Sequence, residues 1–189
     1  MKIQQGFAAQ FVVQDPPLGT GHAVLKALPA LGDFAGSVLI MYGDVPLIKE
    51  ETLKKLIRVH QKQKAALSFA TARLDHAPPY GRIFRNEQGE VLKIIEAKDI
   101  LKEQSHINEF NVGLYLIEAS FLKKTLKKLS SANKQHEYYL TDLVELAARA
   151  KQKIATLDIN DELEWQGINN QLDLARVEKR ILQDRCQHW

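Results

Sequence analysis

A short apolar stretch that ends in a glycine–aspartate pair most constrains how this chain can fold. Five apolar or aromatic residues at 38–42 precede Gly43-Asp44, and Pro46 then prevents any regular continuation. Such a run is too short for a helix and predicts a strand buried on both faces. In open α/β sheets, ligands bind beyond the carboxyl ends of the parallel strands. Asp44 is therefore positioned to hold a cation against a substrate; the alternative is that Asp44 caps the next turn.

The composition fits one globular domain. The chain has 189 residues, of which 45% are hydrophobic and 26% charged, so a core can form. Its net charge of +3 arises from basic residues mixed with acidic ones, and a nucleic-acid groove is not expected. Cys186 is the single cysteine, which excludes an internal disulfide. No apolar run approaches the roughly 18 residues that span a bilayer, and residues 1–5 lack the core of a signal peptide, so we expect a cytoplasmic location without membrane insertion.

The first half of the chain alternates predicted strands with predicted helices. Strand patterns occupy 7–13, 38–44 and 65–72. Between them lie a helical pattern that begins near Ala23 and an amphipathic helix at 49–63. This order is typical of a parallel sheet with crossover helices.

The second half adds a hairpin, two further strands and three helices. The hairpin strands are 81–85 and 91–95, which flank a turn at 86–89. The remaining predicted strands are 111–117 and 154–159, and the predicted helices are 120–129, 140–150 and 172–183. We therefore predict one α/β domain whose mixed, mostly parallel sheet lies between helices.

The Gly19-Thr20-Gly21 turn lies between a predicted strand and a predicted helix. Its backbone N–H groups could bind an anion or a base edge, and two glycines allow a ligand to approach the backbone closely. A tight turn without a ligand would need similar residues, so both interpretations stay open. The segment is not a Walker loop, because no Gly-Lys-Ser/Thr follows it.

Asp44 and Asn169 are candidates for binding a hard cation. Magnesium takes one or two protein oxygens and completes its shell with water and substrate phosphate. Asn169 could supply the second oxygen, or it could be the N-cap of the final helix. The six histidines show no zinc-ligand spacing, and there is no nucleophile elbow.

Two further polar positions lie at predicted strand ends. Glu96 ends one strand and Asn111 begins another, so both could hydrogen-bond sugar hydroxyls. The alternative for Glu96 is a surface ion pair with Lys98. The segment 137–142 either opens a helix, with Thr141 or Asp142 as the capping residue, or closes over a ligand.

Seven segments together resemble one enzyme family. In chain order they are Leu18-Gly19-Thr20-Gly21-His22-Ala23, Tyr42-Gly43-Asp44-Val45-Pro46-Leu47-Ile48, Tyr80-Gly81-Arg82-Ile83, Ile95-Glu96-Ala97-Lys98-Asp99, Asn111-Val112-Gly113, Glu137-Tyr138-Tyr139-Leu140-Thr141-Asp142 and Gly167-Ile168-Asn169-Asn170. They resemble the uridylyltransferase domain of the bacterial bifunctional N-acetylglucosamine-1-phosphate uridylyltransferase/glucosamine-1-phosphate acetyltransferase. The resemblance extends from about Phe7 to the final helix. It implies a Rossmann-like nucleotide-diphospho-sugar transferase fold.

The resemblance also implies an activity and a site. That family makes UDP-N-acetylglucosamine and pyrophosphate from UTP and N-acetylglucosamine 1-phosphate, for peptidoglycan and lipopolysaccharide synthesis. By resemblance, the catalytic residues Asp44 and Asn169 hold magnesium. The residues implied at the uracil end of the nucleotide are Gln14, Gly19 and Thr20, and those implied around the sugar are Tyr42, Gly43, Gly81, Glu96 and Asn111. The in-line attack needs positioning and charge neutralisation rather than a protein nucleophile.

The sequence departs from the family at both ends. Nothing before Phe7 resembles the strand and glycine-rich loop that cradle the triphosphate, and no β-helix domain follows the final helix. We therefore expect an N-terminally truncated nucleotidyltransferase domain at 1–171 and a connecting helix at 172–189, with impaired activity and no oligomer through a β-helix. The alternatives are a non-catalytic sugar-nucleotide-binding or interaction module, and a nucleotidyltransferase for another sugar 1-phosphate.

Overall fold

Strand β5 (Glu109–Glu118) lies at the centre of a six-stranded sheet in the computed structural model, which describes residues 9–75 and 77–186. The sheet order is β4-β3-β5-β2-β6, and β1 also pairs with β5. The other strands are β1 (Ser37–Met41), β2 (Leu67–Arg73), β3 (Arg82–Arg85), β4 (Val91–Ile95) and β6 (Ile154–Asp158). The α/β class and the mixed sheet are thus confirmed.

The strand directions differ from the prediction of a mostly parallel sheet. Strands β1 and β2 are both antiparallel to β5, which separates them, and β3 is antiparallel to β4 and to β5. The pairing of β2 with β6 is the parallel one among the described residues. Strands β1, β2 and β6 therefore run in one direction, as the crossover pattern predicted, but β5 lies between two of them. Local apolar periodicity is the same for either direction of a strand, so the sequence pattern did not reveal this.

The prediction that β1 is buried on both faces is wrong. Leu39 is 40% exposed and Met41 is 42% exposed. Within the described part of the chain, β1 pairs with β5 alone, so one of its edges has no strand beside it. The apolar run therefore predicts correctly that residues 37–41 form a strand, but it does not show that this strand lies at the edge of the sheet.

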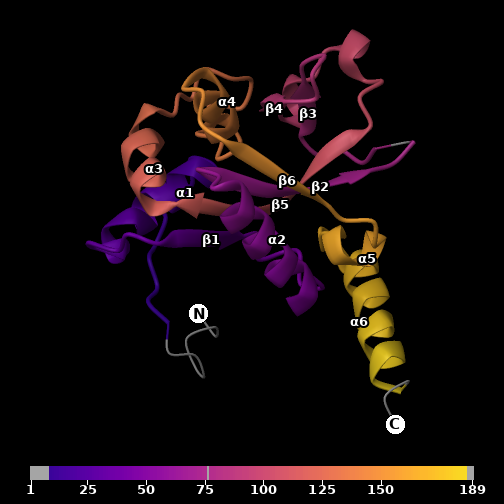
Figure 1. Ribbon diagram of the computed structural model, residues 1–189. Coiled ribbons are helices and arrows are strands. Elements are labelled where there is room, and N and C mark those ends of the chain that lie inside the picture. Colours follow the sequence, from indigo (N-terminus) through magenta and orange to yellow (C-terminus); the bar gives the residue numbers. More distant parts are fainter. Residues whose placement is uncertain (1–8, 76, 187–189) are drawn as a thin grey trace.

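Helices cover both faces of the sheet, and the side chains of β5 alternate between two cores. Tyr115 and Ile117 belong to one core with residues of α4, whereas Leu114 and Leu116 belong to the other with Leu56 of α2. This alternation is the period of two that a strand imposes. The helices are α1 (Thr20–Ala27), α2 (Glu50–Gln63), α3 (Ala119–Thr125), α4 (Asp142–Arg149), α5 (Glu162–Trp165) and α6 (Gln171–Cys186), as shown in Figure 1. Short 3-10 helices occupy Leu28–Leu31, Ala97–Asp99, Lys102–Gln104 and Leu126–Lys128.

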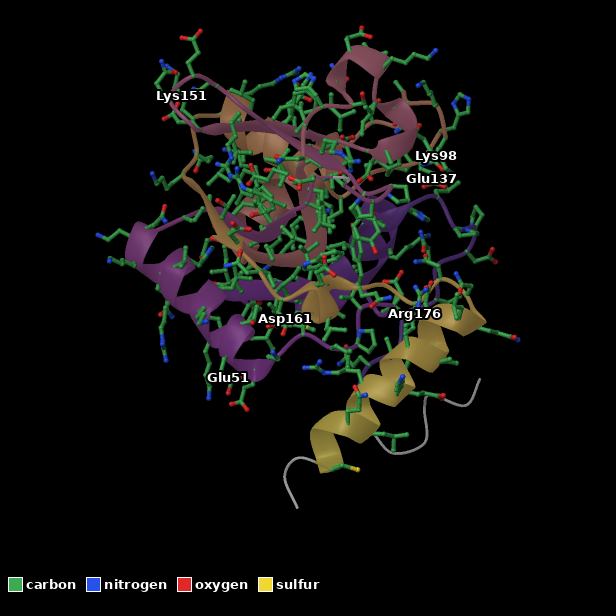
Figure 2. The ribbon with its side chains drawn as sticks, turned by 90° about the vertical axis from the view of Figure 1, so that its right-hand side faces the viewer. Glu51, Lys98, Glu137, Lys151, Asp161 and Arg176 are labelled. Carbon is green, nitrogen blue, oxygen red and sulfur yellow. The ribbon has the colours of Figure 1, made fainter. Side chains whose placement is uncertain are left out.

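The two ends of the described chain lie apart from this body. Residues 9–13 form no strand, although the pattern predicted one at 7–13, of which 7 and 8 lie outside the described residues. Val13 is 80% exposed, because no neighbouring strand receives it. Helix α6 extends away from the sheet in both views (Figures 1 and 2). Along α6, Val177 is buried, whereas Leu174 and Ile181 are exposed. No helix of the described residues has the length and apolar character needed to cross a membrane.

Candidate active site

A pocket of about 310 Å³ lies just beyond the end of β1. Asp44 follows β1, Glu96 follows β4, and Asn111 lies near the start of the antiparallel strand β5. The ends of three strands therefore contribute residues to the lining of this pocket. The full lining is Thr20, Tyr42, Asp44, Val45, Pro79, Tyr80, Gly81, Glu96, Asn111, Val112, Gly113, Gln135, Glu137, Tyr139, Trp165, Gly167 and Asn169. The structure therefore brings together residues from most of the length of the described chain.

Most of the predicted site residues line this pocket. Those that do are Thr20, Tyr42, Asp44, Gly81, Glu96, Asn111 and Asn169. Gln14, Gly19 and Gly43 are not part of the lining. Gln14 instead packs behind the pocket residue Thr20. Its Nε2 donates a hydrogen bond of 2.9 Å to the carbonyl of Gly19 and lies 3.1 Å from Nδ1 of the buried His22.

The Gly19-Thr20-Gly21 turn is packed against residues 138–140. The N–H of Gly21 donates to the carbonyl of Tyr138 at 2.7 Å, so it is already used within the protein. Gly19 has a φ of 100°, and a Cβ there would lie 2.7 Å from the carbonyl oxygen of Tyr138. The glycine is thus required by both conformation and close approach. Thr20 accepts a hydrogen bond of 3.0 Å from the N–H of Leu140, which fixes it at the pocket wall.

Asp44 and Asn169 are brought to the same pocket without the capping roles that were their alternatives. The cap of α6 is Asn170, whose Oδ1 accepts hydrogen bonds from the N–H groups of Leu172 and Asp173 at 2.9 and 3.0 Å. No hydrogen bond or ion pair within the described chain involves the Asp44 carboxylate. Both side chains therefore have oxygens that remain available to a ligand.

Glu96 is a half-buried carboxylate held by a neighbouring hydroxyl. Thr141 donates a hydrogen bond of 2.7 Å to its Oε1. Burial raises the pKa of Glu96, the negative charges of Asp99 and Glu137 raise it further, and the hydrogen bond from Thr141 lowers it. The alternative ion pair with Lys98 is not formed, because Lys98 donates to Gln135 instead.

Asn111 is fixed by hydrogen bonds on both sides of its amide. Its Nδ2 donates to the Tyr115 hydroxyl at 2.6 Å, and its Oδ1 accepts from the N–H of Gly113 at 3.2 Å. Gly113 has a φ of 83°, and a Cβ there would lie 2.5 Å from the Tyr42 ring, so glycine is needed for this contact. Burial raises the pKa of Tyr42 to about 12, and the nearby Glu96 adds to the shift.

Arg82 shapes another wall that the sequence reasoning did not assign. Arg82 is 8% exposed, and its guanidinium donates to the carbonyls of Ala77, Pro78 and Tyr80 at 2.9, 2.7 and 2.5 Å. Burial lowers its pKa. The loop that it organises presents Tyr80, whose hydroxyl accepts a hydrogen bond of 3.3 Å from the N–H of Gly167. Tyr80 and Arg82 flank Gly81 in one of the seven segments that resemble the enzyme family, and this position was the sequence feature that could have indicated their role.

The charge of the pocket determines what it can bind. Its lining contains the carboxylates of Asp44, Glu96 and Glu137 and no lysine, arginine or histidine among the described residues. A phosphate group placed there would meet like charge unless a cation accompanied it. Carboxylate and amide oxygens are donors that magnesium accepts, so Asp44 and Asn169 fit a magnesium ion shared with phosphate. The polar groups of Glu96 and Asn111 fit the hydroxyls of a sugar.

Comparisons with known proteins identify the family and the fold of this chain. Residues 2–184 match the family described as nucleotidyl transferase. The chain belongs to the nucleotidyl transferase family. A solved structure of apo-UDP-glucose pyrophosphorylase has a TM-score of 0.72 at 18% identity, and the match covers 93% of this chain and 64% of that one. That likeness establishes the fold, and the predicted nucleotide-diphospho-sugar transferase fold is confirmed.

Close relatives share substantial sequence with this nucleotidyl transferase chain. It is 42% identical over 180 residues to the bifunctional protein GlmU of Prochlorococcus marinus (strain MIT 9211) and 44% identical over 183 residues to that of Pelotomaculum thermopropionicum (strain DSM 13744 / JCM 10971 / SI). Each match covers 95% of this chain but only 39% and 40% of the relative. The chain thus spans about 40% of the length of these curated relatives.

Proposed function

We propose that this chain belongs to an enzyme that transfers a uridylyl group from UTP to N-acetylglucosamine 1-phosphate, forming UDP-N-acetylglucosamine and pyrophosphate. The observation that carries the proposal is the gathering of Asp44, Glu96, Asn111 and Asn169 in one pocket, within a chain that is 42% identical to a GlmU protein. A role in peptidoglycan and lipopolysaccharide precursor synthesis, in the cytoplasm, is part of the same proposal.

The sugar occupies the part of the pocket between β3, β4 and β5. Glycine is needed at residue 81 on this wall, since a Cβ would lie 2.9 Å from Cγ2 of Ile94 and 3.3 Å from Oε2 of Glu96 and would push the carboxylate out of place. The Glu96 carboxylate accepts hydrogen bonds from sugar hydroxyls, and Asn111 adds a polar contact from the facing strand. Tyr42, which lines the pocket beside Asp44, borders the sugar phosphate.

The nucleotide lies toward Thr20, with the Gln14–Gly19 contact supporting that wall from behind. Asp44 and Asn169 would hold magnesium, which would neutralise phosphate charge in the pocket. Their oxygens suit such an ion, and the acidic lining needs one. A phosphate oxygen of N-acetylglucosamine 1-phosphate attacks the α-phosphorus of UTP, a new P–O bond forms, and the bond to the β-phosphate breaks to release pyrophosphate. The chain's residues align the two phosphates and provide no covalent nucleophile.

Binding and turnover of the 189-residue chain test the proposal. Calorimetry with UDP-N-acetylglucosamine and magnesium should show binding that Glu96→Ala and Asn111→Ala each weaken by about tenfold or more, since each removes a hydrogen-bonding group. The exposed Glu87 lies on the β3–β4 turn, and Glu87→Ala is the matched control. A wild-type chain that binds no UDP-sugar would contradict the proposal.

Pyrophosphate release from UTP and N-acetylglucosamine 1-phosphate separates catalysis from binding. Turnover above background, abolished by Asp44→Asn, would support the transferase reaction in this chain itself. Binding without pyrophosphate release would instead favour the non-catalytic sugar-nucleotide-binding module. A panel of sugar 1-phosphates in the same assay would identify a different sugar substrate.

A further inference from the structure

Thr141 and Glu96 form a partly buried contact between segments that are 45 residues apart. Glu96 follows β4, whereas Thr141 lies immediately before α4. The Thr141 hydroxyl is fully buried, with 0% of the residue exposed, and it donates to Oε1 of Glu96 at 2.7 Å. Thr141 does not line the pocket, and Glu96 is the pocket residue to which its hydroxyl donates.

This contact replaces the capping role expected from the position of Thr141. Threonine before a helix commonly accepts hydrogen bonds from the first N–H groups of that helix. Thr141 forms no such side-chain bond to α4. A cap contributes to helix stability, so a hydroxyl directed elsewhere at this position indicates a different use. The hydrogen bond to a carboxylate is also stronger than a bond between neutral groups.

The hydrogen bond distinguishes the two oxygens of Glu96. Oε1 accepts the hydrogen bond from Thr141, whereas Oε2 forms no hydrogen bond within the described part of the chain and lies at the stretch of pocket wall that Glu96 shares with Gly81. We propose that Thr141 is a positioning residue that fixes the Glu96 carboxylate so that Oε2 faces the sugar of a bound UDP-sugar. This inference rests on the proposed function, because it concerns the sugar side of that pocket. It assigns to Thr141 a part in distinguishing a UDP-sugar from the nucleotide alone.

The hydrogen bond from Thr141 favours the ionised form of Glu96, whereas the other surroundings of this carboxyl group disfavour it. The titratable groups near it belong to several elements and are Tyr42, Asp99, Tyr115, Glu137, Tyr139 and Asp142. None of these groups is a cation, and Asp99 and Glu137 raise the pKa of Glu96 together with burial. The Thr141 hydroxyl is the side-chain donor that lowers this pKa. Without it, Glu96 would be protonated at higher pH and would accept fewer hydrogen bonds from a sugar.

Isosteric replacement of Thr141 provides the test. Thr141→Val keeps the shape and removes the hydroxyl, whereas Thr141→Ser keeps the hydroxyl. Thr125→Val is the matched control, because Thr125 is also buried but lies in α3 away from the pocket. Calorimetry with magnesium measures the affinity of each variant for UDP-N-acetylglucosamine and for UDP. Carboxyl NMR of glutamate-labelled protein, assigned with Glu96→Gln, follows the Glu96 titration without any ligand.

The expected result has three parts. Thr141→Val binds UDP-N-acetylglucosamine about tenfold more weakly or worse, as for loss of a hydrogen bond to a charged group, but binds UDP as the wild type does. Its Glu96 titrates at higher pH than in the wild type. Thr141→Ser keeps the wild-type affinity for UDP-N-acetylglucosamine and the wild-type titration of Glu96. Thr125→Val also changes neither the affinity nor the titration.

Several outcomes would overturn the inference. Equal loss of UDP and UDP-N-acetylglucosamine binding would indicate a general structural effect of Thr141→Val. Wild-type affinity of Thr141→Val, failure of Thr141→Ser to restore binding, or an unshifted Glu96 titration would each remove the positioning role. Failure of the proposed function is distinguishable, because the wild type itself would then bind neither UDP nor UDP-N-acetylglucosamine. A shifted Glu96 titration in Thr141→Val would still demonstrate the hydrogen bond in that case. The role of Thr141 toward a ligand would nevertheless be rejected.

Discussion

The backbone N–H of Ile168 donates a hydrogen bond of 2.8 Å to the carbonyl oxygen of Asp44. These residues are far apart in the chain, yet the bond ties the turn after β1 to the segment before α6. Asp44 and Asn169 consequently lie on adjoining parts of one pocket wall. A backbone bond of this kind fixes the two proposed magnesium ligands relative to each other without using either side chain.

Replacement of Asp44 by asparagine should selectively remove magnesium-dependent binding. Asp44→Asn keeps the side-chain shape and removes the negative charge, so affinity for UTP in magnesium should fall by about tenfold or more, as for loss of one interaction with a charged group. Affinity without magnesium should change little. Calorimetry in magnesium and in a chelator measures both. The exposed Asp33 provides the control variant Asp33→Asn, and equal effects of the two substitutions would argue against a metal role for Asp44.

Tyr80 should link the sugar side of the pocket to the metal side through its hydroxyl. Tyr80→Phe removes the acceptor of the Gly167 N–H bond but keeps the ring, whose centroid lies 5.7 Å from that of Phe110. The free energy of unfolding should fall by about 0.5–1.5 kcal/mol, the usual net value of one hydrogen bond. Magnesium-dependent UTP binding should weaken with it. Denaturant unfolding and calorimetry would show this.

The control for Tyr80→Phe is Tyr138→Phe. The Tyr138 hydroxyl forms no side-chain hydrogen bond within the described chain, so its removal should leave stability nearly unchanged. If both variants unfold at the same denaturant concentration as the wild type, the Tyr80–Gly167 bond contributes nothing in solution.

The sequence predicted most elements because apolar periodicity is a local property. The amphipathic pattern at 49–63 became α2 (Glu50–Gln63), and the hairpin pattern became β3 and β4. It failed where the outcome depends on neighbours. The run at 7–13 has strand-like residues, yet residues 9–13 have no partner strand and stay exposed. The direction of β5 and the exposed side of β1 likewise depend on which strands meet.

The candidate site shows the same division. The order of the seven segments along the chain predicted Asp44, Glu96 and Asn169 as site residues, and the fold places all three in one pocket. Choosing between Asn169 and Asn170 as the helix cap was not possible from sequence, because a shift of one residue decides which side chain reaches the N–H groups of α6. The Thr141–Glu96 bond was also beyond reach, since nothing local to either residue indicates the other.

Gly81 should tolerate no side chain. In Gly81→Ala the new Cβ would lie 2.9 Å from Cγ2 of Ile94 and 3.3 Å from Oε2 of Glu96, so one of them must move. Overpacking of this kind costs about 1–3 kcal/mol in the free energy of unfolding. Affinity for UDP-N-acetylglucosamine should fall while affinity for UDP stays near the wild-type value. Loss of both affinities would indicate collapse of the pocket rather than displacement of Glu96.

Asp142 should make the protein less stable as the pH rises through mildly acidic values. Burial raises the pKa of Asp142 to about 6, and the negative charges of Glu145, Glu96 and Asp99 add to the shift. A carboxyl group whose pKa is higher in the folded state favours folding while it is protonated. Its contribution is therefore complete below the unfolded-state pKa, near the reference value of about 4, and is lost as the pH rises through about 6.

Asp142→Asn removes this titration while keeping the size of the side chain. Between pH 4 and pH 7 the wild type should lose stability relative to Asp142→Asn, because only the wild type must ionise a partly buried carboxyl among like charges. Thermal unfolding at half-unit pH intervals measures the difference between the two midpoint temperatures. The exposed Asp75 gives the control Asp75→Asn, whose midpoint should follow that of the wild type across the whole range. A constant difference between wild type and Asp142→Asn would mean that Asp142 does not titrate in this window, and that solvent reaches it more freely than its burial indicates.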